Sequence, residues 1–184
     1  MKYLILFFSL FLSDLAQAQL PTEIKNEDAP FERLRLRHVK GKVGLEASYG
    51  LSKFGPYFGV GYVNFLNDKL IFNPNIKYEL GTIGTSRFEQ YAFFMSLQRT
   101  FYHYKQLGYF NAGLAPVLHV QRADNEIVNK HETFFPMGVS VDANIEVFIT
   151  NGVVLKIEAS EIFSNDKFGF CRFVAGAGLR VYFK

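Results

Sequence analysis

The sequence predicts an all-β protein, an eight-stranded antiparallel up-and-down transmembrane β-barrel of the outer-membrane type. Three observations support this prediction. Apolar and polar residues alternate along several long segments, as they do in strands that have two different faces. A short apolar segment with the features of a secretory signal peptide precedes them. No other apolar run could span a bilayer as a helix, so a membrane protein with this sequence must be a barrel.

The first 18 residues are expected to be a signal peptide that is removed after export. The charged start Met1-Lys2 is followed by the apolar run Tyr3–Leu12 and by Ala16-Gln17-Ala18, which has the spacing of a cleavage site. An uncleaved inner-membrane anchor is the alternative, but the apolar run is short for a spanning helix of roughly 20 residues. We therefore expect the mature chain to be located in the cell outer membrane.

Residues 19–38 form an extended periplasmic arm in this interpretation, and residues 39–184 form the barrel. The arm contains two prolines, alternating charges and few apolar residues, so it has no core of its own. Arg33, Arg35 and Arg37 alternate there with leucines. A solvated linker, an incipient strand, a plug in the barrel lumen and a contact for periplasmic partners are the alternatives for this arm.

The clearest pair of strands is the hairpin formed by residues 137–149 and 153–160. In both segments the odd-numbered residues are apolar or small, and most even-numbered residues are polar, charged or Gly. The turn Thr150-Asn151-Gly152 between them contains Asn-Gly, the strongest short-range hairpin signal. The first segment reaches the roughly 9–11 residues that a strand needs to cross a bilayer, whereas soluble strands are typically about 5–6 residues long.

The remaining strands show the same alternation. They are expected at Val43–Leu51, Phe58–Asn64, Leu70–Leu80, Gln90–Gln98, Tyr109–Val120 and Arg172–Phe183. Pro74 removes a hydrogen-bond donor from its strand, so we expect a β-bulge at that position. Phe94 is an apolar residue on the otherwise polar face of the next strand.

The connections between these strands differ in length. Short turns are expected at Asn67, Tyr102 and Asn151, and longer polar loops at Ser52, Gly81–Arg87, Arg122–Thr133 and Glu161–Asp166. Outer-membrane barrels have short periplasmic turns and longer outer loops. This asymmetry and the strand lengths argue against the alternative of a secreted, lipocalin-like barrel with an apolar interior.

Aromatic residues gather near the predicted strand ends, as in the interfacial girdles of membrane barrels. The two expected girdles are Phe65, Phe101, Tyr102, Phe148 and Phe183 at one end, and Phe54, Tyr57, Phe88, Phe135 and Phe168 at the other.

The face opposite the lipid is expected to carry charges of both signs. These residues are Lys42, Glu46, Lys69, Lys77, Glu79, Asp142, Glu146, Lys156, Glu158, Arg172 and Arg180. A barrel of about eight strands has an interior just wide enough for its own side chains, and buried charges must pair. A salt-bridged lumen that seals the barrel is therefore favoured over a conducting path.

We expect no catalytic, cofactor-binding or metal-binding residues. His119, on the lumen face, and His131, in the next loop, are the candidates for an enzyme, but no Ser lies beside either as a nucleophile. The four histidines are scattered, which disfavours zinc. Gly59-Val60-Gly61 lacks the third glycine of a dinucleotide site. The single cysteine, Cys171, lies on the lipid-facing side and excludes an internal disulfide.

The composition also disfavours direct binding of nucleic acid. The chain has 20 basic and 17 acidic residues, whereas a nucleic-acid surface shows a strong basic excess.

Two segments resemble a known family. Val139-Ser140-Val141-Asp142-Ala143-Asn144-Ile145-Glu146-Val147-Phe148-Ile149-Thr150-Asn151 with Val153-Val154-Leu155, and the ending Phe173-Val174-Ala175-Gly176-Ala177-Gly178-Leu179-Arg180-Val181-Tyr182-Phe183, are similar to the TraO family of Bacteroidetes conjugative transposons. The start Ala16-Gln17-Ala18-Gln19 suits it too, whereas Lys184 departs from the family's terminal aromatic residue.

The resemblance implies an outer-membrane subunit of a conjugative, type IV-like DNA-transfer apparatus. A barrel this small cannot pass DNA, so the expected role is that of an anchor or assembly component. The expected partners are outer-membrane lipids and, through residues 19–38, other proteins of the apparatus on the periplasmic side. A stand-alone barrel that binds surface ligands or stabilises the envelope is the first alternative, and a lipid-modifying outer-membrane enzyme is the second.

Overall fold

The fold was analysed in a computed structural model, in which the described residues are 38–84, 86–104, 107–125, 130–150, 152–166 and 169–183. The expected signal peptide (1–18) and all of the expected arm except His38 lie outside these residues. No described helix is long and apolar enough to cross a membrane.

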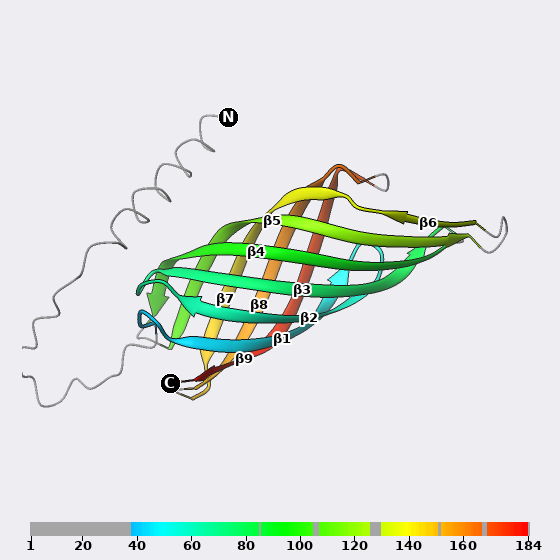
Figure 1. Ribbon diagram of the computed structural model, residues 1–184. Coiled ribbons are helices and arrows are strands. Elements are labelled where there is room, and N and C mark those ends of the chain that lie inside the picture. Colours follow the sequence, from blue (N-terminus) through cyan, green and yellow to red (C-terminus); the bar gives the residue numbers. More distant parts are fainter. Residues whose placement is uncertain are drawn as a thin grey trace, which may run out of the picture.

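The described chain forms a closed antiparallel β-barrel (Figure 1). Its strands are β1 (Val43–Ser52), β2 (Pro56–Phe65), β3 (Leu70–Ile83), β4 (Ser86–Tyr104), β5 (Gly108–Asn125), β6 (Lys130–Phe134), β7 (Met137–Phe148), β8 (Val153–Ser164) and β9 (Cys171–Phe183). Sequential strands pair in an up-and-down order, β1 pairs with β9, and β5 pairs with both β4 and β7.

The strand count agrees with the predicted eight because β6 and β7 act as one strand. Both pair with β5, β6 along residues 121–125 and β7 along residues 108–118. The break falls at Phe135-Pro136, where the His119 amide still donates to the Pro136 carbonyl at 2.9 Å. The fold is therefore the eight-stranded outer-membrane type of barrel that the alternation predicted.

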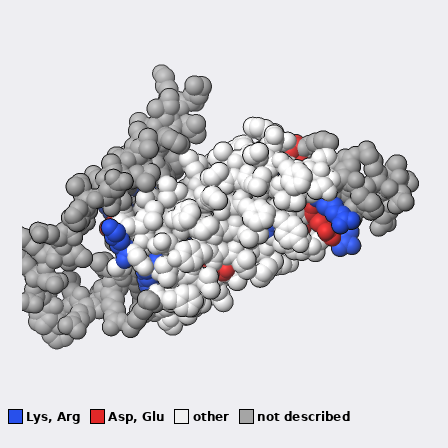
Figure 2. Space-filling view, viewed as in Figure 1, with Lys and Arg blue, Asp and Glu red and all other residues white. Residues whose placement is uncertain are grey.

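The two faces of the wall are as expected for a protein in lipid. Along β1, Leu45, Tyr49 and Leu51 are exposed, and Glu46 and Ser48 are buried. The same alternation continues through β7 and β8, so the apolar side chains point outwards and most charges point into the barrel. The lipocalin-like alternative, which needs an apolar interior, is excluded because apolar residues cover the outside (Figure 2).

Nine of the eleven predicted lumen charges are buried inside the barrel, and two are not. The buried nine are Glu46, Lys77, Glu79, Asp142, Glu146, Lys156, Glu158, Arg172 and Arg180. Lys69 is exposed in the turn before β3, so its placement in the lumen was wrong. Lys42 is half-buried at the barrel mouth, where its ammonium lies 4.5 Å from the centre of the Tyr182 ring.

Several expected loops are in fact parts of strands. β3 ends at Ile83 and β4 begins at Ser86, so both strands reach into the expected loop 81–87. β4 also continues to Tyr104, through the expected turn at Tyr102. β6 lies within the expected loop 122–133 and pairs with the end of β5, and β8 continues to Ser164. Alternation is a weak signal here, because strand ends that leave the membrane have no lipid-facing side to keep apolar.

The predicted aromatic girdles are only partly correct. Phe101, Tyr102, Phe135 and Phe183 are exposed as expected, but Tyr57, Phe65, Phe88 and Phe148 are buried in the interior. Phe54 is half-buried and packs on Phe88 with 4.8 Å between ring centres, and Phe168 lies outside the described residues. An aromatic residue near a strand end lies in a girdle only if its side chain is on the lipid-facing side of the strand. The side chains of Tyr57, Phe65, Phe88 and Phe148 are on the lumen side.

The bulge predicted at Pro74 does not form. The register between β2 and β3 is the same on both sides of it, with Gly61 opposite Asn75 and Asn64 opposite Phe72, and only the pairs between them are missing. Proline has no N–H to donate to the Tyr62 carbonyl opposite it. The side-chain amide of Asn73 donates to that carbonyl at 2.9 Å instead, so the acceptor is satisfied without an extra residue.

Candidate functional site

The interior of the barrel is the candidate site, and it is arranged in layers along the barrel axis. We call the end where β1 begins and β9 ends the basal end, and the opposite end the distal end. The basal turns join β2 to β3, β4 to β5 and β7 to β8. Each layer is built from side chains on several strands that the barrel brings together.

Arg180 is the centre of the basal ionic layer. This side chain is fully buried, and its Nε and Nη2 atoms donate to Glu46 Oε2 at 3.0 and 2.7 Å. Its Nη1 atom donates to Glu146 Oε1. One guanidinium from β9 thus neutralises carboxylates from β1 and β7, which is the charge-assisted pairing that a buried carboxylate requires.

The ionic chain continues towards the middle of the barrel through Lys156. Its Nζ atom lies 3.0 Å from Glu46 Oε1 and 2.7 Å from Glu158 Oε2. Glu158 Oε1 in turn accepts from Lys77 Nζ at 2.8 Å and from the Tyr57 hydroxyl at 2.7 Å. Charges of alternating sign therefore cross the lumen from β7 to β3, as the salt-bridged interpretation predicted.

The basal mouth is closed by an apolar and aromatic cluster. It consists of Val63, Phe65, Ile71, Tyr109, Phe148, Val154 and Tyr182. The Phe148 and Tyr182 rings stack with 5.9 Å between their centres. This cluster separates the ionic layer from the basal solvent, a role that the sequence analysis did not assign to any of these residues.

His38 completes the basal closure. Its ring stacks on Tyr109 at 3.8 Å between centres, and only 3% of the residue is exposed. Nε2 lies 3.2 Å from Glu146 Oε2, and Nδ1 lies 3.2 Å from Thr100 Oγ1. Burial lowers the pKa of His38, which precedes the first strand, and the hydrogen bond with Glu146 raises it in part. The sequence analysis placed His38 in the arm, and no local pattern indicated that it enters the barrel.

A second apolar layer lies between the ionic chain and the distal end. Its members are Tyr57, Ala92, Phe94, Ala115, Val117, Ile162 and Val174. Phe94, which interrupts the polar face of β4, is part of it, and Lys77 Nζ lies 5.3 Å from the centre of its ring. The sequence identified Phe94 as an intrusion, and the barrel supplies its apolar partners.

The distal layer is polar again and contains His119, the candidate for catalysis. Arg172 Nη1 donates to Gln90 Oε1 at 2.9 Å and to Glu79 Oε2 at 3.3 Å. Arg172 Nη2 lies 3.4 Å from His119 Nδ1, and His119 Nε2 has no hydrogen-bond partner among the described atoms. His119 is fully buried, and none of its described hydrogen bonds joins it to a Ser, Thr or Cys, so His119 does not activate a nucleophile among the described residues. The Ser52 hydroxyl in this layer donates to Glu79.

Of the other two candidate residues, Cys171 does not join this layer. The side chain of His131 lies outside the described residues. Cys171 is exposed on the outer wall, as predicted, and its thiol donates to Glu161 at 3.0 Å. The described residues contain no group of three or more His, Cys, Asp or Glu side chains that could hold a metal ion.

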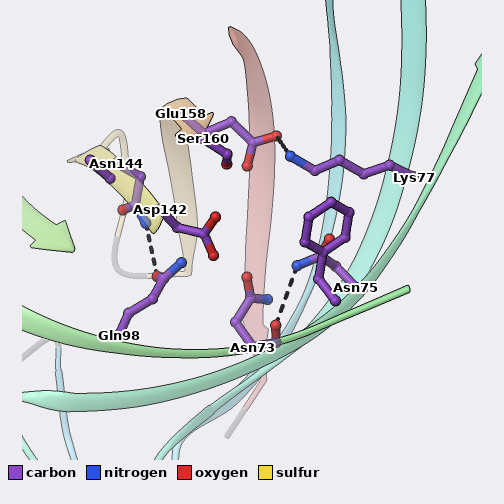
Figure 3. A pocket seen from close by; sticks show the side chains of 10 residues that line it. Asn73, Asn75, Lys77, Gln98, Asp142, Asn144, Glu158 and Ser160 are labelled. Atoms are coloured by element: carbon purple, nitrogen blue, oxygen red, sulfur yellow. Dashed lines mark hydrogen bonds and ion pairs between the residues drawn. The ribbon is translucent and has the colours of Figure 1, made fainter. Parts of the chain in front are cut away.

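The described part of the lumen contains one small polar cavity of about 10 Å³ (Figure 3). Asn73, Asn75, Lys77, Asp142 and Glu158 are among its lining residues. A volume of this size is close to the minimum for a single water molecule. It is an isolated space between layers, too small to conduct ions.

Asp142 differs from the other buried carboxylates of the lumen. It accepts hydrogen bonds from the hydroxyls of Ser96, at 2.7 Å, and Ser140, and no described Lys or Arg forms an ion pair with it. Figure 3 shows its carboxylate pointing into the cavity. Its charge is therefore stabilised by hydroxyl donors alone.

Interior glycines make room for the long charged side chains, as predicted. A Cβ atom on Gly61 would lie 2.9 Å from Glu46 Cγ and 2.8 Å from Asn75 Cβ. Any larger residue there would displace the carboxylate that Arg180 and Lys156 share.

Comparisons with known proteins give the fold. No protein-family model matches the sequence, and no curated protein matches it. The structure is similar to the N-terminal β-barrel domain of OprF from Pseudomonas aeruginosa, with a TM-score of 0.63 and 12% identity over 78% of this chain and 98% of that one. It is also similar to Neisserial surface protein A, with a TM-score of 0.60 and 16% identity over 77% and 96% of the two chains.

A third similar structure is Ail, the attachment invasion locus protein of Yersinia pestis. Its TM-score is 0.55, with 10% identity over 79% of this chain and all of that one. At these identities the likeness shows a shared fold, the small outer-membrane barrel. Together with the apolar outer wall, it supports insertion into an outer membrane.

Proposed function

We propose that the protein is a sealed outer-membrane barrel that serves as an anchor or assembly subunit of a conjugative, type IV-like DNA-transfer apparatus. The observation that carries this proposal is the layered closure of the lumen. The ionic chain from Glu146 to Lys77 lies between two apolar layers, and the cavity beside it, lined by Lys77 and Glu158, measures about 10 Å³. A barrel closed in this way transports neither DNA nor small solutes.

A sealed barrel acts through the surfaces that leave the membrane. The basal end is the periplasmic side in this proposal, because the strands β3 to β6 extend furthest at the distal end and outer-membrane barrels have their longer extensions outside. His38 closes the basal mouth, which is the periplasmic side in this proposal. That is where an arm formed by residues 19–37 would meet partner proteins.

The part in conjugation rests on the resemblance of residues 139–155 and 173–183 to the TraO family. Those residues lie in β7, the start of β8 and β9. They supply Glu146 and Arg180, which form one of the ion pairs of the ionic chain. Arg33, Arg35 and Arg37 of the arm are suited to pairing with carboxylates of a partner.

Deletion of residues 20–35 tests the proposal. We expect the barrel to fold normally, because His38 and every strand remain, and we expect loss of both mating and co-purification with other transfer proteins. Removal of residues 125–130 at the distal end is the matched control and should leave transfer unchanged. Normal transfer without the arm would reject the proposal.

A stand-alone surface-binding barrel is the second candidate, and the distal extension favours it. β5 and β6 continue beyond the part of β5 that pairs with β7, and together with the ends of β3 and β4 they extend the sheet at the distal end (Figure 1). Ail, which has the same fold, is described as an attachment invasion protein. Loss of a surface interaction on removal of residues 125–130, with normal transfer in the arm deletion, would favour this candidate.

A further inference from the structure

The outer wall of the barrel contains an apolar groove across β1 to β4. Its volume is about 460 Å³, and its walls include the outward-facing side chains of Leu45, Val60, Tyr62, Ile76, Phe93 and Met95. All six are at least 40% exposed, on the face that points to the hydrocarbon of the membrane. The groove is therefore a hollow in the lipid-facing surface and has no opening of its own to water.

The backbone of β2 and β3 forms the floor of this groove. Gly61 and Pro74 both line it, and the β2–β3 ladder lacks pairs between Gly61 and Asn64. Pro74 is on the outer side of β3 and cannot donate to the strand opposite. We attribute the hollow to its compact ring and not to Gly61, whose Cβ position faces Glu46 in the lumen.

Basic residues lie at the basal end of the same four strands. Lys42 directly precedes β1, Lys69 directly precedes β3, and Arg99 pairs with Leu70 at the basal part of β4. Main-chain hydrogen bonds link these positions, from the Phe65 amide to the Lys42 carbonyl at 3.0 Å and from the Thr100 amide to the Lys69 carbonyl at 2.7 Å. We call Lys69 and Arg99 the basic rim; Lys42 is not part of it, because its ammonium lies at the barrel mouth, 4.5 Å from the centre of the buried Tyr182 ring.

The charge of this rim is one-sided. Asp68 is the only acidic residue in the described segments 38–42, 65–70 and 99–104. At the distal end basic and acidic side chains lie together, as in the ion pair between Arg87 and Glu89 at 2.9 Å. Figure 2 shows this difference, with Lys and Arg alone at the left edge of the barrel and both signs at the right.

The groove and the basic rim are close enough for one lipid molecule. Strands rise about 3.3 Å per residue, so Met95 in the groove lies about 13 Å along β4 from Arg99 in the basic rim. If the phosphate of a lipid is held at the rim, its acyl chains extend from there towards the middle of the membrane, along the groove. Lys and Arg are suited to hold phosphate oxygens at a membrane surface.

We propose that the β1–β4 wall binds one anionic phospholipid of the periplasmic leaflet, with its phosphate at the basic rim and an acyl chain in the groove. The proposal rests on the outer-membrane location in the proposed function, but not on any part in DNA transfer. The bound lipid would fix the depth and rotation of the barrel relative to the periplasmic surface, where an anchor must present its arm.

Native mass spectrometry of the purified full-length protein tests this site. The protein is reconstituted with equal amounts of phosphatidylglycerol and phosphatidylethanolamine and then released from detergent in the spectrometer. We expect one retained lipid, with phosphatidylglycerol favoured at least fivefold. Lys69→Gln with Arg99→Gln should remove that preference, and Lys69→Arg with Arg99→Lys should keep it, because the charge is unchanged.

A groove-filling variant separates the two halves of the site. Val60→Phe adds a ring to the groove wall and should reduce retention of both lipids, whereas Val141→Phe, on the lipid-facing side of β7, should not. Lys53→Gln with Arg87→Gln is the matched control at the distal end and should keep the preference. Equal retention of the two lipids by the unaltered protein would overturn the proposal, and so would an equal effect of the distal control. If the rim binds an acidic protein instead of a lipid, the unaltered protein should retain the two lipids equally.

These outcomes are independent of the proposed role in DNA transfer. The lipid measurement uses the barrel alone, and the mating assay of the arm deletion leaves the basic rim intact. If the arm deletion mates normally, the expected lipid preference is unchanged. If the two lipids are retained equally, the expected result of the mating assay is unchanged.

Discussion

Arg180 and Glu46 face each other across the seam between the last and first strands of the barrel. They are paired in the β1–β9 register, and the guanidinium donates two hydrogen bonds, of 3.0 and 2.7 Å, to one carboxylate oxygen. Both side chains are buried. This contact joins the first and last strands of the barrel, which are far apart in the sequence. It is therefore also the centre of the ionic chain that fills the lumen.

Replacement of Arg180 should destabilise the barrel strongly. Arg180→Met leaves Glu46 with Lys156 as its remaining cation and Glu146 with only neutral or distant partners, and breaking a buried pair in this way costs about 3–5 kcal/mol. Urea unfolding in lipid vesicles measures the loss. Arg87→Met, at an exposed pair, is the control and should change the unfolding free energy by about 0.5 kcal/mol or less. Equal effects of the two changes would contradict the role of Arg180.

Changes of charge at two adjacent residues of β7 should reduce the stability of the barrel to different extents. Val141→Arg places a cation on the lipid-facing side near mid-strand and should cost about 2–4 kcal/mol. Asp142→Asn, on the lumen side, should be milder, because Asp142 has hydroxyl partners and no ion pair with a described residue. The same unfolding assay compares the two. A larger loss for Asp142→Asn would show that the carboxylate charge is required in the lumen.

The reconstituted barrel should not conduct ions. The ionic chain and the two apolar layers fill the described lumen with paired charges and buried apolar side chains. Planar-bilayer recordings should show a baseline without stable steps, after insertion is confirmed by protease protection in vesicles of the same lipid. A steady, ion-selective current from the protein alone would refute the sealed lumen.

His38 should make stability depend on pH. Because burial lowers the pKa of His38 below its ordinary value of 6.5, the unfolded chain binds more protons than the folded protein just below that pH. Folding stability is therefore lost as the pH falls through about 6.5 and is regained above it. Unfolding free energies at about pH 7.5 and about pH 5 should differ more for the unaltered protein than for His38→Gln.

The variant isolates the contribution of His38 from those of other titrating groups. Glu146, Arg180 and Lys42 are the charged groups that act on the His38 ring, and all of them remain in His38→Gln. An identical pH dependence in the two proteins would show that His38 keeps its ordinary pKa, and with it that the basal mouth is open to water.

The candidate site was predictable in kind but not in arrangement. The alternation identified Glu46, Glu146, Lys156 and Arg180 as lumen residues one by one, because in a strand the face of a residue depends on its position alone. Which carboxylate pairs with which cation could not be predicted. Glu46 and Arg180 lie at opposite ends of the barrel sequence, and only closure between β1 and β9 makes them neighbours.

By itself, the sequence determined which residues face lipid and which face the lumen, and hence the class of the fold. That information is local, since each strand repeats its pattern every two residues whatever its neighbours are. Only the tertiary structure decided that Phe65 and Phe148 pack into one basal cluster, that Asn73 replaces the donor missing at Pro74, and that His38 closes the basal mouth. Each of these depends on the strand or segment that lies alongside, and closure of the barrel fixes that neighbour across distances no local pattern records.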